Sequence, residues 1–128
     1  MARTLAELVN EAKQHIECLT PEAVAAELAR GVLLVDVREP GERETNGCIE
    51  GGRSVPRGVL ELHADPASPA YDAAFDRKQR IILHCASGGR SALAGHTLRL
   101  MGFEDVAHLE GGLAAWIASG LPVARPRE

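Results

Sequence analysis

Aromatic residues are scarce in this chain of 128 residues and make up only 3% of it. Single-stranded nucleic-acid platforms need rings on which bases stack, so this composition argues against that class of protein. Hydrophobic residues still reach 45% and charged residues 25%, which is average for a globular domain and excludes wholesale disorder. The core must therefore be aliphatic, with few rings to add to it: Tyr71, Phe75, Phe103 and Trp116.

Long apolar runs are also missing. No segment approaches the roughly 20 apolar residues that cross a bilayer. The N-terminal segment carries Glu7, Glu11 and Lys13 at helical intervals, so we do not expect a secretory leader there. Basic runs are equally absent, and 14 basic against 18 acidic residues give a net charge of −4. Nucleic-acid and membrane partners are therefore not expected, although backbone amides can still hold a small anion.

Cysteine is sparse, with Cys18, Cys48 and Cys85 and no CxxC pair. An odd number without such spacing fits neither a disulfide framework nor a structural zinc site. Thiols persist in reducing compartments, so we expect a cytoplasmic protein. We expect no cofactor and no metal.

Short apolar runs alternate with helical patterns along the chain. The runs 32–35 and 81–84 predict strands buried on both faces, and 106–109 predicts a third. No hairpin dipeptides separate these strands, which favours right-handed crossovers. The sequence therefore predicts a single-domain α/β fold, a three-layer arrangement with a mostly parallel sheet and helices on both faces. Helices are expected after Thr20, over 40–45, near 71–75, over 91–101 and over 113–119.

The N-terminal residues 1–15 are predicted to form a helical extension, because Leu5, Leu8, Val9 and Ala12 recur at helical spacing. Residues 16–125 are predicted to form the main domain. The extension either caps that domain or mediates dimerisation, and the oligomeric state stays open.

The loop after the strand at 81–84 is the candidate for chemistry, because ligands of parallel sheets bind at the carboxyl ends of strands. Cys85 stands at that end, and small residues and Arg90 follow before the next helix. Gly88 and Gly89 can adopt positive φ, so backbone N–H groups can surround the sulfur at a helix N-terminus. The loop predicted to bind substrate comprises Ala86, Ser87, Gly88, Gly89, Arg90 and Ser91.

A free thiol is mostly protonated at neutral pH, and amide dipoles with a nearby arginine favour the thiolate. Cys85 is therefore a candidate nucleophile. The alternative is a small, inert, buried cysteine. That alternative explains neither the glycine pair nor Arg90, so the whole loop favours the reactive interpretation.

Three further segments accompany this loop. Asp36-Val37-Arg38-Glu39 follows an expected strand, and 42–56 includes Gly47, Ile49, Gly51 and Pro56. Glu110-Gly111-Gly112, Trp116 and Gly120-Leu121-Pro122 come near the end of the chain. In this order and spacing, over about residues 19–123, the chain resembles the rhodaneses, a family of sulfurtransferases.

The resemblance implies a mechanism without a cofactor. The Cys85 thiolate would take the outer sulfur of a small anionic donor such as thiosulfate, become a persulfide, and pass the sulfur to cyanide, a thiol or a protein acceptor. Amides of residues 86–91 would hold the donor. Arg90 would either attract the donor or support the loop.

Two positions depart from the family pattern. Cys48 stands where the family has histidine, and Glu50 where it has proline. A loop without that proline is expected to be more mobile. Cys48 could resolve a Cys85 persulfide into a disulfide, but the favoured interpretation is a buried packing residue.

Two other functions stay open. The segment His84 to Ser91 resembles the signature of cysteine phosphatases, which would imply phosphate or arsenate chemistry, but it lacks one residue. The loop from Cys85 to Arg90 is too short for the wider ring that a phosphoryl group's three oxygens need. A non-catalytic regulatory or binding module with this fold is the second alternative, and the retained cysteine loop argues against it.

Other polar residues have structural interpretations. Asp36 and Arg38 are predicted to form a paired charge network that supports the loop, because either charge buried alone would cost several kcal/mol. Strand alternation turns His84 away from the side of Cys85. No metal-ligand spacing is found for the remaining histidines, which are His15, His63, His96 and His108.

Overall fold

The computed structural model describes residues 2–126. Its five strands form one sheet in the order β1-β5-β4-β2-β3. All neighbouring strands are parallel. The central strands coincide with the apolar runs of the sequence, which confirms the predicted parallel sheet. The strands are β1 (Glu17–Leu19), β2 (Leu33–Asp36), β3 (Arg53–Ser54), β4 (Ile81–His84) and β5 (Val106–Leu109).

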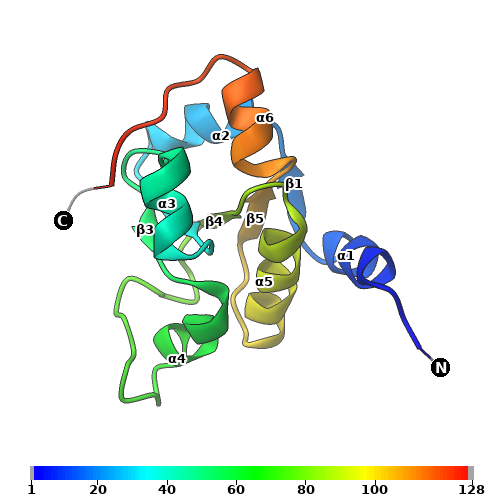
Figure 1. Cartoon of the computed structure of the whole chain (residues 1–128). Helices are drawn as coiled ribbons and strands as arrows, with labels where there is room; N and C mark the ends of the chain where they lie inside the picture. Colours follow the sequence, from blue (N-terminus) through cyan, green and yellow to red (C-terminus); the bar gives the residue numbers. More distant parts are fainter. Residues whose placement is uncertain (1, 127–128) are drawn as a thin grey trace.

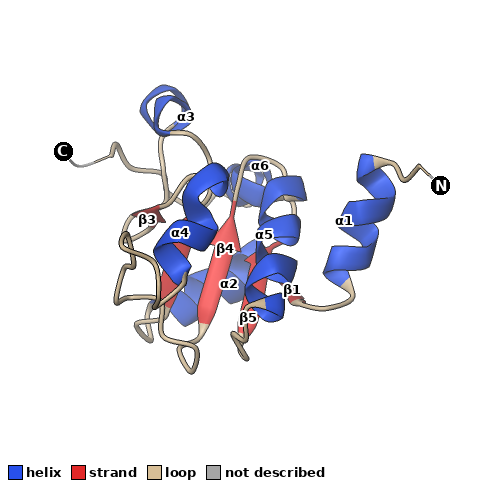
Figure 2. Cartoon of the chain, turned by 90° about the horizontal axis from the view of Figure 1, so that it is seen from below, coloured by secondary structure: helices blue, strands red, loops and turns tan. Residues whose placement is uncertain are grey.

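Helices cover both faces of the sheet, as predicted (Figures 1 and 2). The helices α4 and α5 lie on one face, with α1 beside α5, while α2 and α6 lie on the other. None of the helices within residues 2–126 is long and apolar enough to span a bilayer. The helices are α1 (Leu5–Lys13), α2 (Pro21–Leu28), α3 (Pro40–Asn46), the 3₁₀ turn η1 (Arg57–Val59), α4 (Leu60–Ala64), α5 (Gly89–Leu100) and α6 (Gly112–Ala118).

Two apolar clusters, one on each face, hold the layers together. On the α5 side, Leu83 and Cys85 pack with Leu98. On the α6 side, Ile82 packs with Leu109 and Trp116. Successive apolar residues of β2 and of β4 alternate between the two clusters, as the pleat requires. Because β4 is buried on both faces, the position of Cys85 at its end is rigid.

Local signals mark several helix boundaries correctly. Thr20 caps α2 by accepting a hydrogen bond from the Ala23 N–H, and Pro21 is the first helical residue. The helix expected near 71–75 is wrong, because turns occupy that segment. There the Asp72 side chain bonds the Ala74 N–H and so offers the backbone an alternative to a helix.

The predicted N-terminal helix is present as α1, and Thr4 and Glu7 form a capping box at its start. Ala12 is fully buried, whereas Leu5 and Leu8 are 68% and 41% exposed. His15, just after α1, stacks on His96 of α5 with ring centroids 4.4 Å apart. The extension therefore packs beside α5, next to the layer that carries the Cys85 loop.

Candidate active site

Cys85 lies between the end of β4 and the start of α5, and its side chain is 1% exposed. Its Sγ accepts hydrogen bonds from the backbone N–H of Gly88 at 3.1 Å and of Ser91 at 3.4 Å. The peptide hydrogens therefore face the sulfur rather than the solvent. This arrangement favours negative charge on the sulfur.

The loop adopts this shape because Gly88 has φ +107°, a left-handed conformation that side chains disfavour. A Cβ at this position would also lie 3.2 Å from the backbone N of Gly111. Helix geometry leaves the N–H groups of Gly89, Arg90 and Ser91 without intrahelical acceptors. The first turn of α5 thus supplies amide donors on the side of Cys85.

The start of α6 fixes the loop from the other side. The N–H of Leu113 bonds the carbonyl of Cys85 at 2.9 Å, and that of Ala114 bonds the carbonyl of Ala86 at 3.1 Å. Gly112 permits this approach, because a Cβ there would lie 2.6 Å from Ala86 O and 2.7 Å from Cys85 O. Sequence reasoning found Gly111 and Gly112 only through the family resemblance and gave them no part in the site.

Ser91 links the sulfur to a second buried side chain. The Cys85 thiol donates to Ser91 Oγ at 3.6 Å, and Ser91 Oγ lies 2.8 Å from His108 Nδ1. The hydroxyl donates to the Gly88 carbonyl at 3.2 Å. Because His108 comes from β5, distant in sequence, no local pattern could reveal this contact.

Arg90 points to Glu42 of α3, and both of its terminal nitrogens donate to that carboxylate, at 2.8 and 2.9 Å. The Arg90 hydrogen bonds hold the pKa of Glu42 at about 2. The pair ties α3 to the first turn of α5. The carboxylate of Glu42 therefore neutralises the positive charge of the Arg90 guanidinium.

Beneath the loop, Asp36 is completely buried and accepts hydrogen bonds from Arg38 Nε at 3.0 Å and Nη2 at 2.8 Å. Arg43 of α3, which sequence reasoning missed, donates to the same carboxylate at 2.7 Å. Arg38 also bonds the Gly47 carbonyl at 2.9 Å. The network joins the end of β2 to the middle and the C-terminal end of α3.

The surroundings of Asp36 set its charge. Burial on its own would raise the pKa, but hydrogen bonds from Arg38 and nearby positive charge lower the pKa of Asp36 to about 2. His84 Nε2 lies 3.7 Å from the carboxylate, on the face opposite Cys85. Burial lowers the pKa of His84.

The structure thus brings Cys85, Gly88 and Ser91 into one hydrogen-bonded group. Ala86 is held by α6, and the side chain of Ser87 is exposed. Gly89 opens α5.

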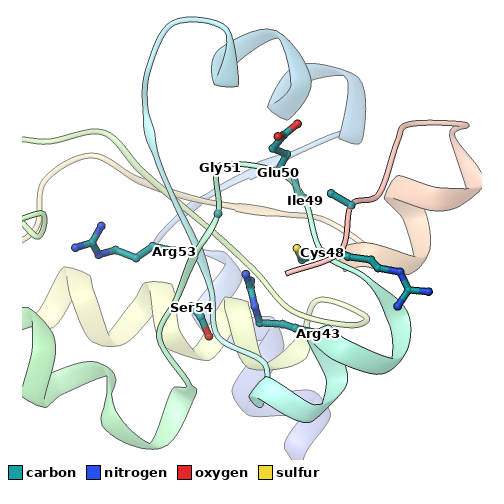
Figure 3. Close-up of a pocket in the computed structure, with 10 residues that line it drawn as sticks. Arg43, Cys48, Ile49, Glu50, Gly51, Arg53 and Ser54 are labelled. Atoms are coloured by element: carbon teal, nitrogen blue, oxygen red, sulfur yellow. The ribbon is translucent and has the colours of Figure 1, made fainter. Parts of the chain in front are cut away.

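A pocket of about 530 Å³ lies beside Cys48 rather than Cys85 (Figure 3). Arg43, Gly52 and Ser54 are among its lining residues. Cys48 is buried, and its backbone forms an antiparallel bridge with Ala124, with N–O distances of 2.8 and 2.7 Å. All three cysteines are free. These contacts favour the interpretation of Cys48 as a packing residue.

Comparison with known proteins identifies one family. The Rhodanese-like domain matches residues 20–119, which lie within the predicted domain 16–125. A sulfurtransferase of Allochromatium vinosum is 32% identical over 95 residues, covering 74% of this chain and 80% of that protein. Thiosulfate sulfurtransferase 16 of Arabidopsis thaliana, a chloroplastic protein, is 34% identical over 115 residues, covering 83% and 95%. The chain spans about half (49%) of an uncharacterized Synechocystis relative that is 36% identical.

Solved structures agree on the fold. A Rhodopseudomonas palustris protein of unknown function, described as a possible tyrosine phosphatase, is 40% identical with a TM-score of 0.91, covering 96% of each chain. Thiosulfate sulfurtransferase of Pseudomonas aeruginosa is 30% identical with a TM-score of 0.77, covering 96% of this chain and 23% of that one.

Replacing Asp36 with Asn tests the buried network. The change leaves Arg38 and Arg43 without their carboxylate, so we expect the free energy of unfolding to fall by about 3–5 kcal/mol at neutral pH. Because the folded pKa of about 2 lies below the ordinary 3.8, the contribution of Asp36 is complete above about pH 4 and is lost as the pH falls towards 2. The wild-type protein should therefore lose about 2 kcal/mol of its free energy of unfolding as the pH falls from about 4 to 2, and the Asp36→Asn variant should not show this loss. Urea unfolding at several pH values measures both effects.

The matched control is Glu61→Gln, which breaks the exposed pair between Arg57 and Glu61. It should cost less than about 1 kcal/mol. Equal losses in the two variants would contradict a special role for Asp36.

Replacing Gly112 with Ala tests the contact between α6 and the loop. Left-handed φ costs an alanine about 1 kcal/mol, and the clash with Ala86 and Cys85 should add about 1–3 kcal/mol. Gly51 is the control, because its φ is +86° but a Cβ there meets nothing within 4 Å. Urea unfolding should separate Gly112→Ala from Gly51→Ala, and the rate of Cys85 alkylation should change only in the former. Similar behaviour of both variants would contradict the proposed contact.

Proposed function

Because the chain belongs to the family of rhodanese-like domains, we propose that it is a sulfurtransferase whose sulfur carrier is Cys85. The observation that carries this proposal is the convergence of the Gly88 and Ser91 amides on the Cys85 sulfur. That geometry suits a reaction in which negative charge lies first on the Cys85 sulfur, as a thiolate, and then on the outer sulfur bonded to it, as a persulfide.

The proposed reaction has two half-reactions. In the first, the Cys85 thiolate attacks the outer sulfur of thiosulfate, the S–S bond of a Cys85 persulfide forms, and sulfite leaves with the electron pair of the broken S–S bond. In the second, cyanide or a thiolate attacks the outer sulfur of the persulfide, and the Cys85 thiolate is released. No external oxidant or reductant is needed. Three free cysteines suit a reducing compartment, so the proposed location is the cytoplasm.

Backbone amides are the proposed donor-binding groups, because the arginines near the loop already have partners. Arg90 is paired with Glu42, and Arg38 with Asp36. Of the two roles open for Arg90, we propose support of the loop. Its planar fork binds both carboxylate oxygens, which a point charge does less well.

Phosphate-ester hydrolysis is the second candidate, since the Rhodopseudomonas palustris protein is described as a possible tyrosine phosphatase. The length of the loop argues against phosphatase chemistry, because the six residues from Cys85 to Arg90 form a ring too narrow for a phosphoryl group. In addition, the Arg90 guanidinium is turned to Glu42, whereas a phosphoryl group needs positive charge placed on its oxygens. A non-catalytic module is the third candidate. A non-catalytic role does not explain why backbone amides point at the Cys85 sulfur.

The first test is intact mass after incubation with thiosulfate. We expect the wild-type chain to gain one sulfur atom, because the amides stabilise the persulfide, and to lose it again on adding cyanide, with thiocyanate as product. Cys85→Ser should gain nothing. Cys48→Ser is the matched control and should behave as the wild type.

Aryl phosphate hydrolysis is measured in parallel. Hydrolysis that depends on Cys85, without any gain of sulfur, would replace the proposal by the phosphatase. Absence of both activities would favour the non-catalytic module.

The second test compares Arg90→Lys with Arg90→Ala. Arg90 is proposed to support the loop through its paired hydrogen bonds to Glu42. In that case the turnover number (kcat) of sulfur transfer should fall by a similar factor, about ten or more, in both variants. Retained turnover in Arg90→Lys, with only Arg90→Ala raising the KM for thiosulfate, would instead assign Arg90 to donor binding. Steady-state kinetics with thiosulfate and cyanide distinguish the two results.

A further inference from the structure

Three side chains with metal-ligating atoms meet at the edge of the sheet where β1 pairs with β5. Cys18 and His108 are direct partners in the parallel register. Glu110 follows two residues after His108, so all three side chains share the face that carries α1 and α5. The cysteine sulfur, a histidine nitrogen and a carboxylate oxygen all lie within 4.8 Å of one another.

The hydrogen bonds around His108 leave one of its ring nitrogens unsatisfied. In the tautomer of His108 with its hydrogen on Nδ1, that nitrogen donates to Ser91 Oγ, 2.8 Å away, and the Ser91 hydroxyl donates to the Gly88 carbonyl. His108 Nε2 is then a lone-pair acceptor, completely buried and without a hydrogen-bond partner.

This unpartnered nitrogen faces another acceptor. His108 Nε2 lies 3.0 Å from Glu110 Oε1. With the ring hydrogen on Nδ1, the nitrogen and the carboxylate oxygen are both acceptors, and a cation between them satisfies both; with the hydrogen on Nε2, that hydrogen is shared with Glu110 instead. The nearby sulfur of Cys18 distinguishes the two, because a proton shared by nitrogen and oxygen has no use for a thiol, whereas zinc binds nitrogen, oxygen and sulfur together.

We propose that Cys18 Sγ, His108 Nε2 and Glu110 Oε1 bind a divalent cation of the zinc class. Binding releases the thiol proton of Cys18 to solvent, and a water molecule completes the tetrahedral coordination. Hard cations such as magnesium are not expected, because they prefer oxygen ligands only. The proposed cation site does not require that Cys85 transfers sulfur.

The geometry needs little adjustment for this ligand set. Nitrogen, oxygen and sulfur ligands of tetrahedral zinc are roughly 3.3–3.6 Å apart. His108 is fixed, whereas Cys18 and Glu110 are exposed and can rotate into place. Lys13 of α1 occupies the other carboxylate oxygen of Glu110, Oε2, at 2.8 Å, so Oε1 is the oxygen directed at the site.

Two features connect this site with the rest of the molecule. The hydrogen bond from Nδ1 to Ser91 is the kind of outer contact that fixes the tautomer of a metal-binding histidine. The same Ser91 contacts Cys85. Spacing along the sequence does not reveal the group, because strand pairing alone brings Cys18 next to His108.

Zinc titration of the full chain tests the proposal. The background carries Cys48→Ser and Cys85→Ser, so that Cys18 is the one remaining thiol. Competition with a chromophoric chelator should give one zinc ion per chain. Cobalt substitution should give a thiolate-to-cobalt charge-transfer band and tetrahedral absorption.

Cys18→Ser and Glu110→Gln, both at exposed positions, should each weaken zinc binding by about tenfold or more. Cys18→Ser should also abolish the charge-transfer band. His63→Asn is the control and should leave binding unchanged. Failure to bind zinc, or equal binding with and without Cys18, would overturn the proposal and assign the contact of His108 with Glu110 to a shared proton.

Discussion

The chemistry proposed for Cys85 depends on the two hydrogen bonds by which the start of α6 holds the carbonyls of Cys85 and Ala86. The C=O and N–H of a planar trans peptide point in opposite directions. Fixing those carbonyls against α6 therefore turns the following N–H groups away from it and commits the chain to curl around the sulfur. The glycine at 112 matters for the same reason, since a side chain there would occupy the space of the carbonyl oxygens. The Cys85 site is thus built from the first turns of α5 and α6 and the C-terminal end of β4.

Charge around the loop is largely balanced by internal pairs. Asp36 is shared by Arg38 and Arg43, and Glu42 takes Arg90. All of these groups fix the segment 36–47 and its helix α3 relative to the loop. The attraction for an anion is therefore left to backbone dipoles, which are neutral overall. A chain with a net charge of −4 can therefore still offer the site that we propose for a negatively charged sulfur.

Much of the fold could be predicted from the sequence, because parallel strands buried on both faces appear as continuous apolar runs, such as 81–84. The Cys85 loop was also accessible, since its glycines and its helix start are local in the chain. Side-chain contacts between different helices and strands were not. The approach of Arg43 to Asp36 and of His108 to Ser91 follows from the tertiary structure alone. At 71–75 the prediction failed because the Asp72 side chain competed with the helix for the backbone.

The near-complete burial of the Cys85 sulfur has a consequence for the timing of the proposed cycle. A donor can reach the sulfur only when the surrounding segment yields, so loading needs a local opening motion. The atom added by that attack lies on the path along which the donor came. The outer sulfur of the persulfide therefore lies closer to the protein surface than the Cys85 sulfur does. An acceptor can reach that outer sulfur with less rearrangement of the protein. The two steps are unequal in their demand for motion, and large acceptors, including another protein, are better suited to the second step than large donors are to the first.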